Sequence, residues 1–293
     1  MRIAHLIMAH KGPEQIVRLV TSMAHEGADF YIHLDAKADR REFEFLETLP
    51  GVRLTTTRMY VRWASYRFTK AILECTREIL ATGIDYDFVN LMSAQDYPIK
   101  PAEAIHDFFA RNIGRSFLSF ESNEEDSAWW AHAMSRVELY HSTYFKFKGQ
   151  YVLQAIINRV LPKRKFPLPY TLYGGMDGSW WTISRTCAQY LIDFVDSNPT
   201  LERFSMFTWG SDEFLISTIL MNSPYRSTIV NDNYRYIDWS QGGANPKVLT
   251  ADDFESLRDS HKLFARKFDT EVDTTVLDLV DEYLLAAPLQ PVS

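Results

Sequence analysis

Residues 3–35 read IAHLIMAHKGPEQIVRLVTSMAHEGADFYIHLD, and their pattern sets the frame for the rest of the chain. Residues 3–8 are an apolar run typical of a core strand, 16–23 carry apolar residues at helical spacing, and 30–34 predict a second strand. A strand, a helix and a strand in this order predict a right-handed parallel unit, in which ligands lie beyond the carboxyl ends of the strands. His10 and Asp35 follow those two ends, so we expect both at a ligand site.

The next segments extend this α/β pattern. Weak strands are predicted at residues 52–55 and 59–61, and Trp63 and Ser65 then lead into a long helix, with Ser65 as a suitable cap. Residues 88–92 predict a fully buried strand, and the polar loop that follows it, 93–100, contains Asp96. A lone Asp before Tyr-Pro is often only a turn former, but Asp96 is the third polar residue at a strand end of one predicted sheet.

The middle of the chain predicts a helix over 101–110, a strand over 116–120 that leads to Glu121, and an acidic loop over 123–132. Residues 150–165 hold an amphipathic run that ends in Lys163, Arg164 and Lys165. Such a run is able to contact a membrane surface, and basic residues at a helix end also serve simply as partners of the helix dipole. Both interpretations stay open from the sequence.

Two later stretches carry the candidate chemistry. Trp209–Phe214 contain a Gly-Ser break and two acids, and an apolar helical stripe follows over 215–220. This pattern predicts the start of a buried helix, with Asp212 facing the core and Glu213 at the edge of a cleft. The plainer alternative is that both acids complement the helix dipole. Residues 173–185 form a glycine-rich turn, which lets backbone approach a ligand closely, followed by a strand with Trp180 and Trp181. These two point to opposite faces of a strand, so at least one is expected in the core.

Composition limits the classes of function. The chain has 293 residues with 31 basic and 38 acidic side chains and a net charge of −7, which argues against general nucleic-acid binding and leaves phosphate to a few placed cations. Two distant cysteines suggest neither a disulfide framework nor a metal cluster, and a reducing cytoplasm is the simplest compartment. No apolar run reaches the length of a membrane span, and we expect neither a signal peptide nor an anchor.

Six ordered motifs together resemble the core-2/I-branching β-1,6-N-acetylglucosaminyltransferase family, which is glycosyltransferase family 14 and includes the peptide O-xylosyltransferases. The motifs are His33–Lys37, Trp63–Ser65, Asn90–Pro98, Gly178–Trp181, Asp212–Phe214 and Leu263–Asp269. The resemblance runs from about residue 3 to residue 285. It implies a single domain, 1–293, with a GT-A-type α/β fold whose mostly parallel sheet is flanked by helices, a UDP-binding half over 1–120, and an acceptor-binding and catalytic half over 121–293.

The resemblance also implies roles for individual residues. Glu213 matches the catalytic base, Asp35 the aspartate on the uracil side, and Lys267 and, less closely, Lys247 the cations of the diphosphate site. Trp239 resembles an acceptor-stacking tryptophan, and Glu121 and Arg136 fall in the acceptor-binding segment. The donor side is then expected to comprise His10, Asp35, Trp63, Ser65, Asp96, Lys247 and Lys267, and the acceptor side Glu121, Arg136, Trp180, Trp181 and Trp239. Without the resemblance, Lys267 would equally be a solvated cation at a helix end.

The implied reaction is an inverting transfer of N-acetylglucosamine or xylose from a UDP-sugar to a glycan, glycolipid or peptide hydroxyl, without a cofactor or metal. The one Asp-X-Asp match, Asp85–Asp87, precedes a strand and so lies at the wrong edge of the sheet for a diphosphate. A glycoside hydrolase would need a pair of carboxylates, and adjacent helical residues such as Asp212 and Glu213 splay about 100° apart. A non-catalytic carbohydrate-binding protein would keep the tryptophans but would not need Glu213 or Lys267. The animal relatives are Golgi membrane proteins with several disulfides, which this sequence lacks, so their acceptor is not assumed.

Overall fold

A computed structural model describes residues 1–286 of the chain. Its centre is a seven-stranded sheet in the order β10-β6-β9-β4-β1-β2-β3, and only β9 runs antiparallel to its neighbours. The first three strands in the chain are β1 (Ile3–Ala9), β2 (Ala28–Leu34) and β3 (Val52–Leu54). The others are β4 (Phe88–Ser93), β6 (Ser116–Leu118), β9 (Thr182–Ser184) and β10 (Ile229–Asn231). The predicted mostly parallel α/β sheet is therefore confirmed.

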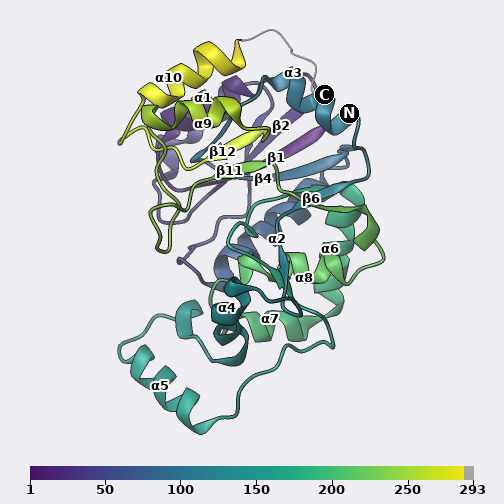
Figure 1. Cartoon of the computed structure of the whole chain (residues 1–293), viewed down its shortest axis with the longest axis vertical. Coiled ribbons are helices and arrows are strands. Elements are labelled where there is room, and N and C mark those ends of the chain that lie inside the picture. The colour runs from purple at the N-terminus through teal and green to yellow at the C-terminus, as the bar shows by residue number, and fades with distance from the viewer. Residues whose placement is uncertain (287–293) are drawn as a thin grey trace.

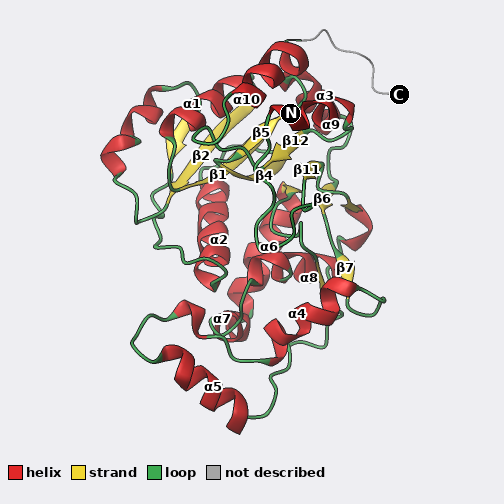
Figure 2. Cartoon of the chain, turned by 60° about the vertical axis from the view of Figure 1, so that its left-hand side comes forward, coloured by secondary structure: helices red, strands yellow, loops and turns green. Residues whose placement is uncertain are grey.

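Helices cover both faces of this sheet (Figure 2). One face packs on α1 (Pro13–Ser22), α3 (Ala102–Ala110) and α10 (Thr275–Val280), and the other on α2 (Tyr66–Ala81), α6 (Arg185–Ser197) and α8 (Leu215–Met221). Alternate residues of β1 supply the two cores, because Ile3 and Ile7 face the first set of helices while Ala4 and Leu6 face the second.

Smaller elements complete the chain. A second sheet contains β5 (Asp96–Pro98), β11 (Arg235–Ile237) and β12 (Phe264–Arg266), and β7 (Glu121–Ser122) pairs with β8 (Tyr173–Gly174). The remaining α-helices are α4 (Ala128–Glu138), α5 (Gln150–Val160), α7 (Pro199–Ser205) and α9 (Phe254–Asp259), with α5 at the extremity of the molecule farthest from the sheet (Figure 1). The division into halves at residue 120 stays a prediction.

Four local predictions are wrong. Residues 59–61 are not a strand, and the loop expected over 123–132 becomes α4 at Ala128, where Ser127 Oγ accepts a hydrogen bond from Trp130 N at 3.0 Å. Ser65 occupies the N-cap position of α2, but its hydroxyl donates backward to Arg62 O at 2.9 Å instead of capping the helix. The polar loop 93–100 contains β5, which pairs with a strand far along the sequence, and such long-range pairing leaves no local signal.

Candidate active site

A cavity of about 380 Å³ opens at the carboxyl ends of β1, β2 and β4. Its walls come from residues that follow these strands, from the turn before α8 and from the residues at the end of β12. The predicted site residues that line it are His10, Asp35, Trp63, Trp180, Glu213, Trp239 and Lys267. The rule that parallel sheets bind ligands at this edge thus locates the cavity.

Glu213 ends a short 3₁₀ turn, Ser211–Glu213, that precedes α8. Gly210 enters the turn at φ 63°, a left-handed conformation that glycine adopts without strain, and Phe214 separates the turn from the helix. The carboxylate lines the cavity and forms an ion pair with Arg136. Burial, followed by repulsion from Asp212, raises the pKa of Glu213 to about 7, although Arg136 acts in the opposite direction. A carboxylate with this pKa is suited to accept a proton near neutral pH.

Arg136 lies behind Glu213 and is not among the side chains that line the cavity. Its guanidinium stands 4.2 Å from the ring centre of Trp209 and 5.2 Å from that of Trp129. Cation–π contact with both rings orients the guanidinium toward the carboxylate of Glu213. The structure therefore gives Arg136 a direct contact with the candidate base, whereas we expected it in contact with an acceptor.

The glycine-rich turn approaches the backbone of Glu213 and not an open ligand site. A Cβ at Gly178 would lie 2.4 Å from Glu213 O, and one at Gly174 would lie 2.5 Å from Phe214 Cβ. The amide of Gly175 also donates to Glu213 O at 3.1 Å. The turn thus supports the carbonyl side of the residue whose carboxylate lines the cavity.

Asp212 lines the cavity beside Glu213, although the helical stripe predicted that it would face the core. That prediction is wrong because residues 211–213 form a 3₁₀ turn that ends at Phe214 and do not continue the stripe of α8. Ser179 Oγ donates to Asp212 Oδ2 at 2.7 Å, and burial raises the pKa of this carboxyl group. The two neighbouring carboxylates consequently have different partners, a serine hydroxyl and an arginine.

Trp180 and Trp181 precede β9 and so lie outside the strand in which we predicted them, but their side chains still lie in different environments. Trp180 lines the cavity, with the guanidinium of Arg266 4.2 Å from its ring centre, whereas Trp181 is fully buried among the core side chains of α2, α6 and α8. The prediction that Trp181 binds an acceptor is therefore wrong. Trp239 lines the cavity and donates from Nε1 to Asp177 Oδ1 at 2.7 Å. Trp63 also lines it and is 63% exposed, so its ring is free to meet a ligand.

The ends of β1 and β2 supply one polar wall. Asp35 is buried, and its carboxylate accepts a hydrogen bond from Lys37 N at 2.9 Å and pairs with Lys37 Nζ at 3.3 Å. His10 lies nearby, where burial lowers its pKa and the charge of Asp35 opposes that effect. A neutral imidazole, a buried carboxylate and a lysine can recognise a polar heterocycle and its sugar hydroxyls.

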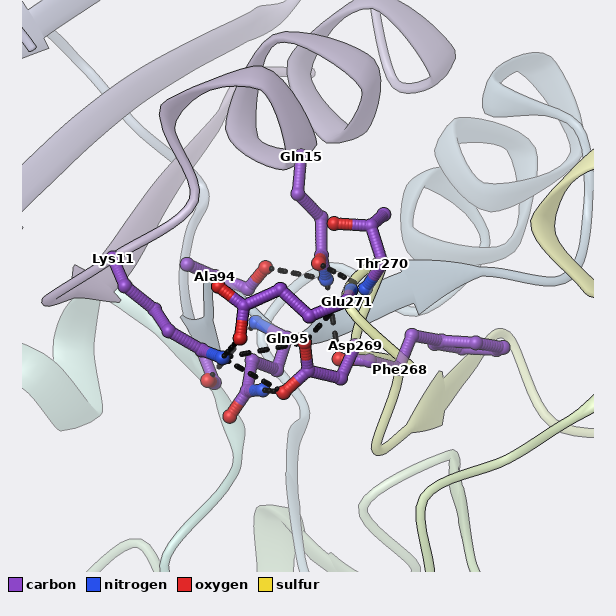
Figure 3. Close-up of polar contacts among 9 residues, drawn as sticks. Lys11, Gln15, Ala94, Gln95, Phe268, Asp269, Thr270 and Glu271 are labelled. Carbon is purple, nitrogen blue, oxygen red and sulfur yellow. Dashed lines mark hydrogen bonds and ion pairs between the residues drawn. The ribbon is translucent and has the colours of Figure 1, made fainter. Parts of the chain in front are cut away.

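Lys267 follows β12 directly, so the alternative that it is a cation at a helix end is wrong. Its side chain lines the cavity, and burial, with the charge of Arg266 next in importance, lowers its pKa. A polar network fixes the loop that follows (Figure 3): Gln15 Nε2 donates to Ala94 O at 3.1 Å and to Phe268 O at 3.2 Å. Lys11 Nζ lies 2.9 Å from Asp269 Oδ2, which secures the loop further (Figure 3).

The other predicted site residues lie outside the cavity lining. Lys247 Nζ pairs with Asp253 at 2.6 Å and lies 4.0 Å from Asp238, so protein carboxylates already hold the predicted second diphosphate cation. The buried Asp96 accepts a hydrogen bond from Ser93 N and lies 3.6 Å from Arg266, and its role is that of a support behind the wall. Ser65 is wholly buried, and Glu121 binds Ser127 in the β7 region. These four side chains do not line the cavity, and their predicted donor or acceptor roles stay predictions.

Sequence reasoning missed several residues of the cavity wall, which are Lys37, Arg62, Gln95, Asp212 and Arg266. Lys37 and Arg266 belong to motifs that the sequence does single out, next to Asp35 and Lys267. Arg266 is buried, and its Nε and Nη1 find no hydrogen-bond partner among residues 1–286. A buried guanidinium with unsatisfied donors beside a cavity is prepared to bind an oxyanion.

A mostly parallel sheet with a cavity at its carboxyl edge defines an α/β protein and is consistent with a GT-A-like fold. Residues 3–258 match the family model described as Core-2/I-Branching enzyme. The chain therefore belongs to the core-2/I-branching family, glycosyltransferase family 14.

Similar proteins include xylosyltransferase 2 from Homo sapiens, 27% identical over 97% of this chain and 34% of that protein. Xylosyltransferase 2 from Rattus norvegicus is 26% identical over 97% of this chain and 34% of its own length, and xylosyltransferase 1 from Rattus norvegicus is 24% identical over 97% and 35% respectively. The chain spans about a third of the length of these relatives.

Proposed function

We propose that this chain is an inverting glycosyltransferase that moves a sugar from a UDP-sugar to an acceptor hydroxyl without a divalent metal. The observation that carries the proposal is the carboxylate of Glu213, which lines a cavity and has a pKa raised to about 7. Family membership supports sugar transfer, and the xylosyltransferase relatives make xylose the first donor sugar to test, with N-acetylglucosamine the second. The acceptor is a glycan, a glycolipid or a peptide.

In this mechanism Glu213 takes the proton from the acceptor hydroxyl as its oxygen attacks the anomeric carbon. The bond from the sugar to UDP breaks on the opposite face, so configuration inverts and UDP leaves with the bonding electron pair. Arg136 lets the carboxylate stay ionised in spite of its burial, and protonation of Glu213 during the reaction weakens that ion pair.

Cations of the cavity wall would meet the charge that develops on UDP. Lys37, Arg62, Arg266 and Lys267 all line the cavity, and of these Arg266 and Lys267 are adjacent in sequence and substantially buried. Fixed cations in a site shielded from water stabilise a departing diphosphate in the same way as a bound dication. His10 and Asp35 are proposed to hold the nucleoside, and Trp180 and Trp239 to stack on sugar rings.

A glycoside hydrolase is a second candidate, because Asp212 and Glu213 both line the cavity. Hydrolysis would require that one carboxyl group protonates a leaving sugar while the other attacks or activates water. Family membership favours transfer. A non-catalytic carbohydrate-binding protein would need neither Glu213 nor the buried cations.

The deciding experiment measures UDP release by the full chain from UDP-xylose and UDP-N-acetylglucosamine, with and without sugar and peptide acceptors, in excess EDTA. We expect one UDP-sugar to give acceptor-dependent release at an undiminished rate in the chelator. An enzyme that EDTA silences and manganese restores would contradict metal independence. Cleavage of nitrophenyl glycosides with no response to any UDP-sugar would favour the hydrolase instead.

A further inference from the structure

Helix α5 (Gln150–Val160) turns polar side chains toward the protein and apolar side chains outward. Gln154 and Asn158 face the protein, where Gln154 Oε1 accepts hydrogen bonds from Ser142 N and Oγ at 2.8 and 2.9 Å. Asn158 exchanges hydrogen bonds with the backbone of Tyr140, at 2.7 and 2.9 Å. A surface helix of a globular protein ordinarily turns such amides outward and its apolar stripe inward.

The outward face of α5 is apolar instead. Tyr151, Val152, Ile156 and Val160 are 64, 67, 54 and 73% exposed. At about 100° per residue these four fall within half of the helix circumference, and Arg159 lies near the middle of that half. An exposed apolar face this continuous is typical of a surface that another apolar phase covers.

The segment around α5 is strongly basic. Residues 139–176 contain six Lys or Arg and no Asp or Glu, although the whole chain has 38 acidic residues and a net charge of −7. Lys146, Lys148, Lys163 and Lys165 are exposed at the two ends of the helix. Lys163 forms an ion pair with Glu138, which leaves Lys146, Lys148 and Lys165 as the exposed lysines that can meet a partner. Basic side chains at both ends of an apolar face indicate a partner that is both apolar and anionic.

The helix also lies at the far extremity of the molecule, where a flat surface can reach it (Figures 1 and 2). A second cavity of about 240 Å³ lies against this helix, and Leu153 and Ile157 help to line it. No helix among residues 1–286 is long and apolar enough to cross a bilayer. Contact through α5 would be peripheral, with the apolar side chains inserted at the headgroup boundary.

We propose that α5 docks the protein on an anionic lipid bilayer. Tyr151, Val152, Ile156 and Val160 enter the interface, and Arg159 extends its charged end to the headgroups. Lys146, Lys148 and Lys165 contact lipid phosphates. A two-fold contact between copies is disfavoured, because it would bring the same basic residues of both chains together. An anionic bilayer both covers the apolar face and attracts the basic side chains around it.

The test is flotation of the full chain with vesicles of phosphatidylcholine that contain phosphatidylglycerol, compared with vesicles of phosphatidylcholine alone. We expect binding to the anionic vesicles, reduced by salt. Ile156→Asp should lower binding at least about tenfold, and Lys146→Glu with Lys148→Glu should lower it by about fivefold or more per residue. Val272→Asp, at a 61% exposed apolar side chain outside this segment, is the matched control and should bind as the wild type does.

Thermal unfolding of each variant distinguishes a lost surface from a lost fold, since all these side chains are exposed and their replacement should leave the melting temperature nearly unchanged. Absence of binding to anionic vesicles by the wild type would overturn the proposal. So would equal binding to neutral vesicles, or binding that Ile156→Asp leaves intact. A concentration-dependent dimer that Ile156→Asp dissociates, without vesicle binding by the wild type, would assign the face to a second copy instead.

Discussion

Lys267 and Lys247 lie in two different loops, and their ammonium groups have different surroundings. Lys267 lines the cavity, where burial and the neighbouring Arg266 lower its pKa, whereas Lys247 is paired with Asp253 and raised in pKa by that hydrogen bond. The resemblance to a family assigns both lysines to one diphosphate. The difference predicts that Lys267 is more available to a ligand than Lys247, which Asp253 already holds at 2.6 Å.

Replacement of the candidate base, Glu213, gives the largest expected effect. Glu213→Gln keeps the shape of the side chain and removes its basicity, so turnover should fall by about 10²- to 10⁴-fold with little change in UDP binding. UDP release at saturating acceptor measures the loss, and UDP titration checks binding. Glu26→Gln, at an exposed glutamate on another surface, is the matched control. Near-full turnover in Glu213→Gln would refute the assignment of the base.

The two lysines themselves give the next largest effect. Lys267→Ala should weaken UDP binding by about 10- to 100-fold and lower turnover, since it removes a charged hydrogen-bond donor from a buried site. Lys247→Ala should change UDP affinity by less than about threefold, because Asp253 and not the ligand holds that lysine. Calorimetric titration with UDP compares them. Equal losses in the two variants would show that the ion pair of Lys247 opens when the donor binds.

The pH dependence follows from the raised pKa of Glu213. Turnover should fall about tenfold for each pH unit below about 7 and level off above it, because only the ionised carboxylate accepts a proton. The same shift affects stability in the opposite direction: the native state binds this proton more tightly than the unfolded state, so stability declines as pH rises from 4.5 to about 7.

Glu213→Gln provides the control for stability, since it should lack that decline, which we expect to be about 1 to 3 kcal/mol. Urea unfolding of both proteins across this range measures it. A decline of the same size in both proteins would place the titrating group elsewhere.

Of the changes considered, replacement of a tryptophan that lines the cavity is expected to alter turnover least. Trp239→Ala should raise the acceptor Michaelis constant several-fold, by roughly 1 kcal/mol of lost stacking, and leave maximal turnover nearly unchanged. Trp181→Ala should instead cost about 3 to 5 kcal/mol of stability, because that ring is fully buried in the core. Acceptor kinetics together with urea unfolding separate the two. A Trp239 variant that unfolds as readily as the Trp181 variant would make Trp239 a core residue.

Local patterns in the sequence were sufficient for the edge of the sheet at which the cavity opens. The helical register assumed for Asp212 and Glu213 was wrong, and only the position of Glu213 beside a cavity agrees with the structure. The β1-α1-β2 unit follows directly from apolar spacing, and His10, Asp35 and Glu213 line the cavity as predicted. Sequence reasoning fell short for two different reasons. The pairing of β5 with β12 joins distant segments and leaves no local signal. The ion pair of Lys247 with Asp253 and the 3₁₀ turn at 211–213 are local, but neither follows from hydrophobic spacing, which reports periodicity and not charge pairing or helix type.

Gly174 and Gly178 bear on any attempt to redesign this protein. A Cβ at Gly178 would lie 2.4 Å from Glu213 O and one at Gly174 2.5 Å from Phe214 Cβ, so a side chain at either position would collide with residues 213–214. A library that varied the cavity wall for a new acceptor could therefore include Met176, which lines it, but would need to keep both flanking glycines fixed. The two glycines, which have no side chain, therefore limit how far the sequence of this turn can vary.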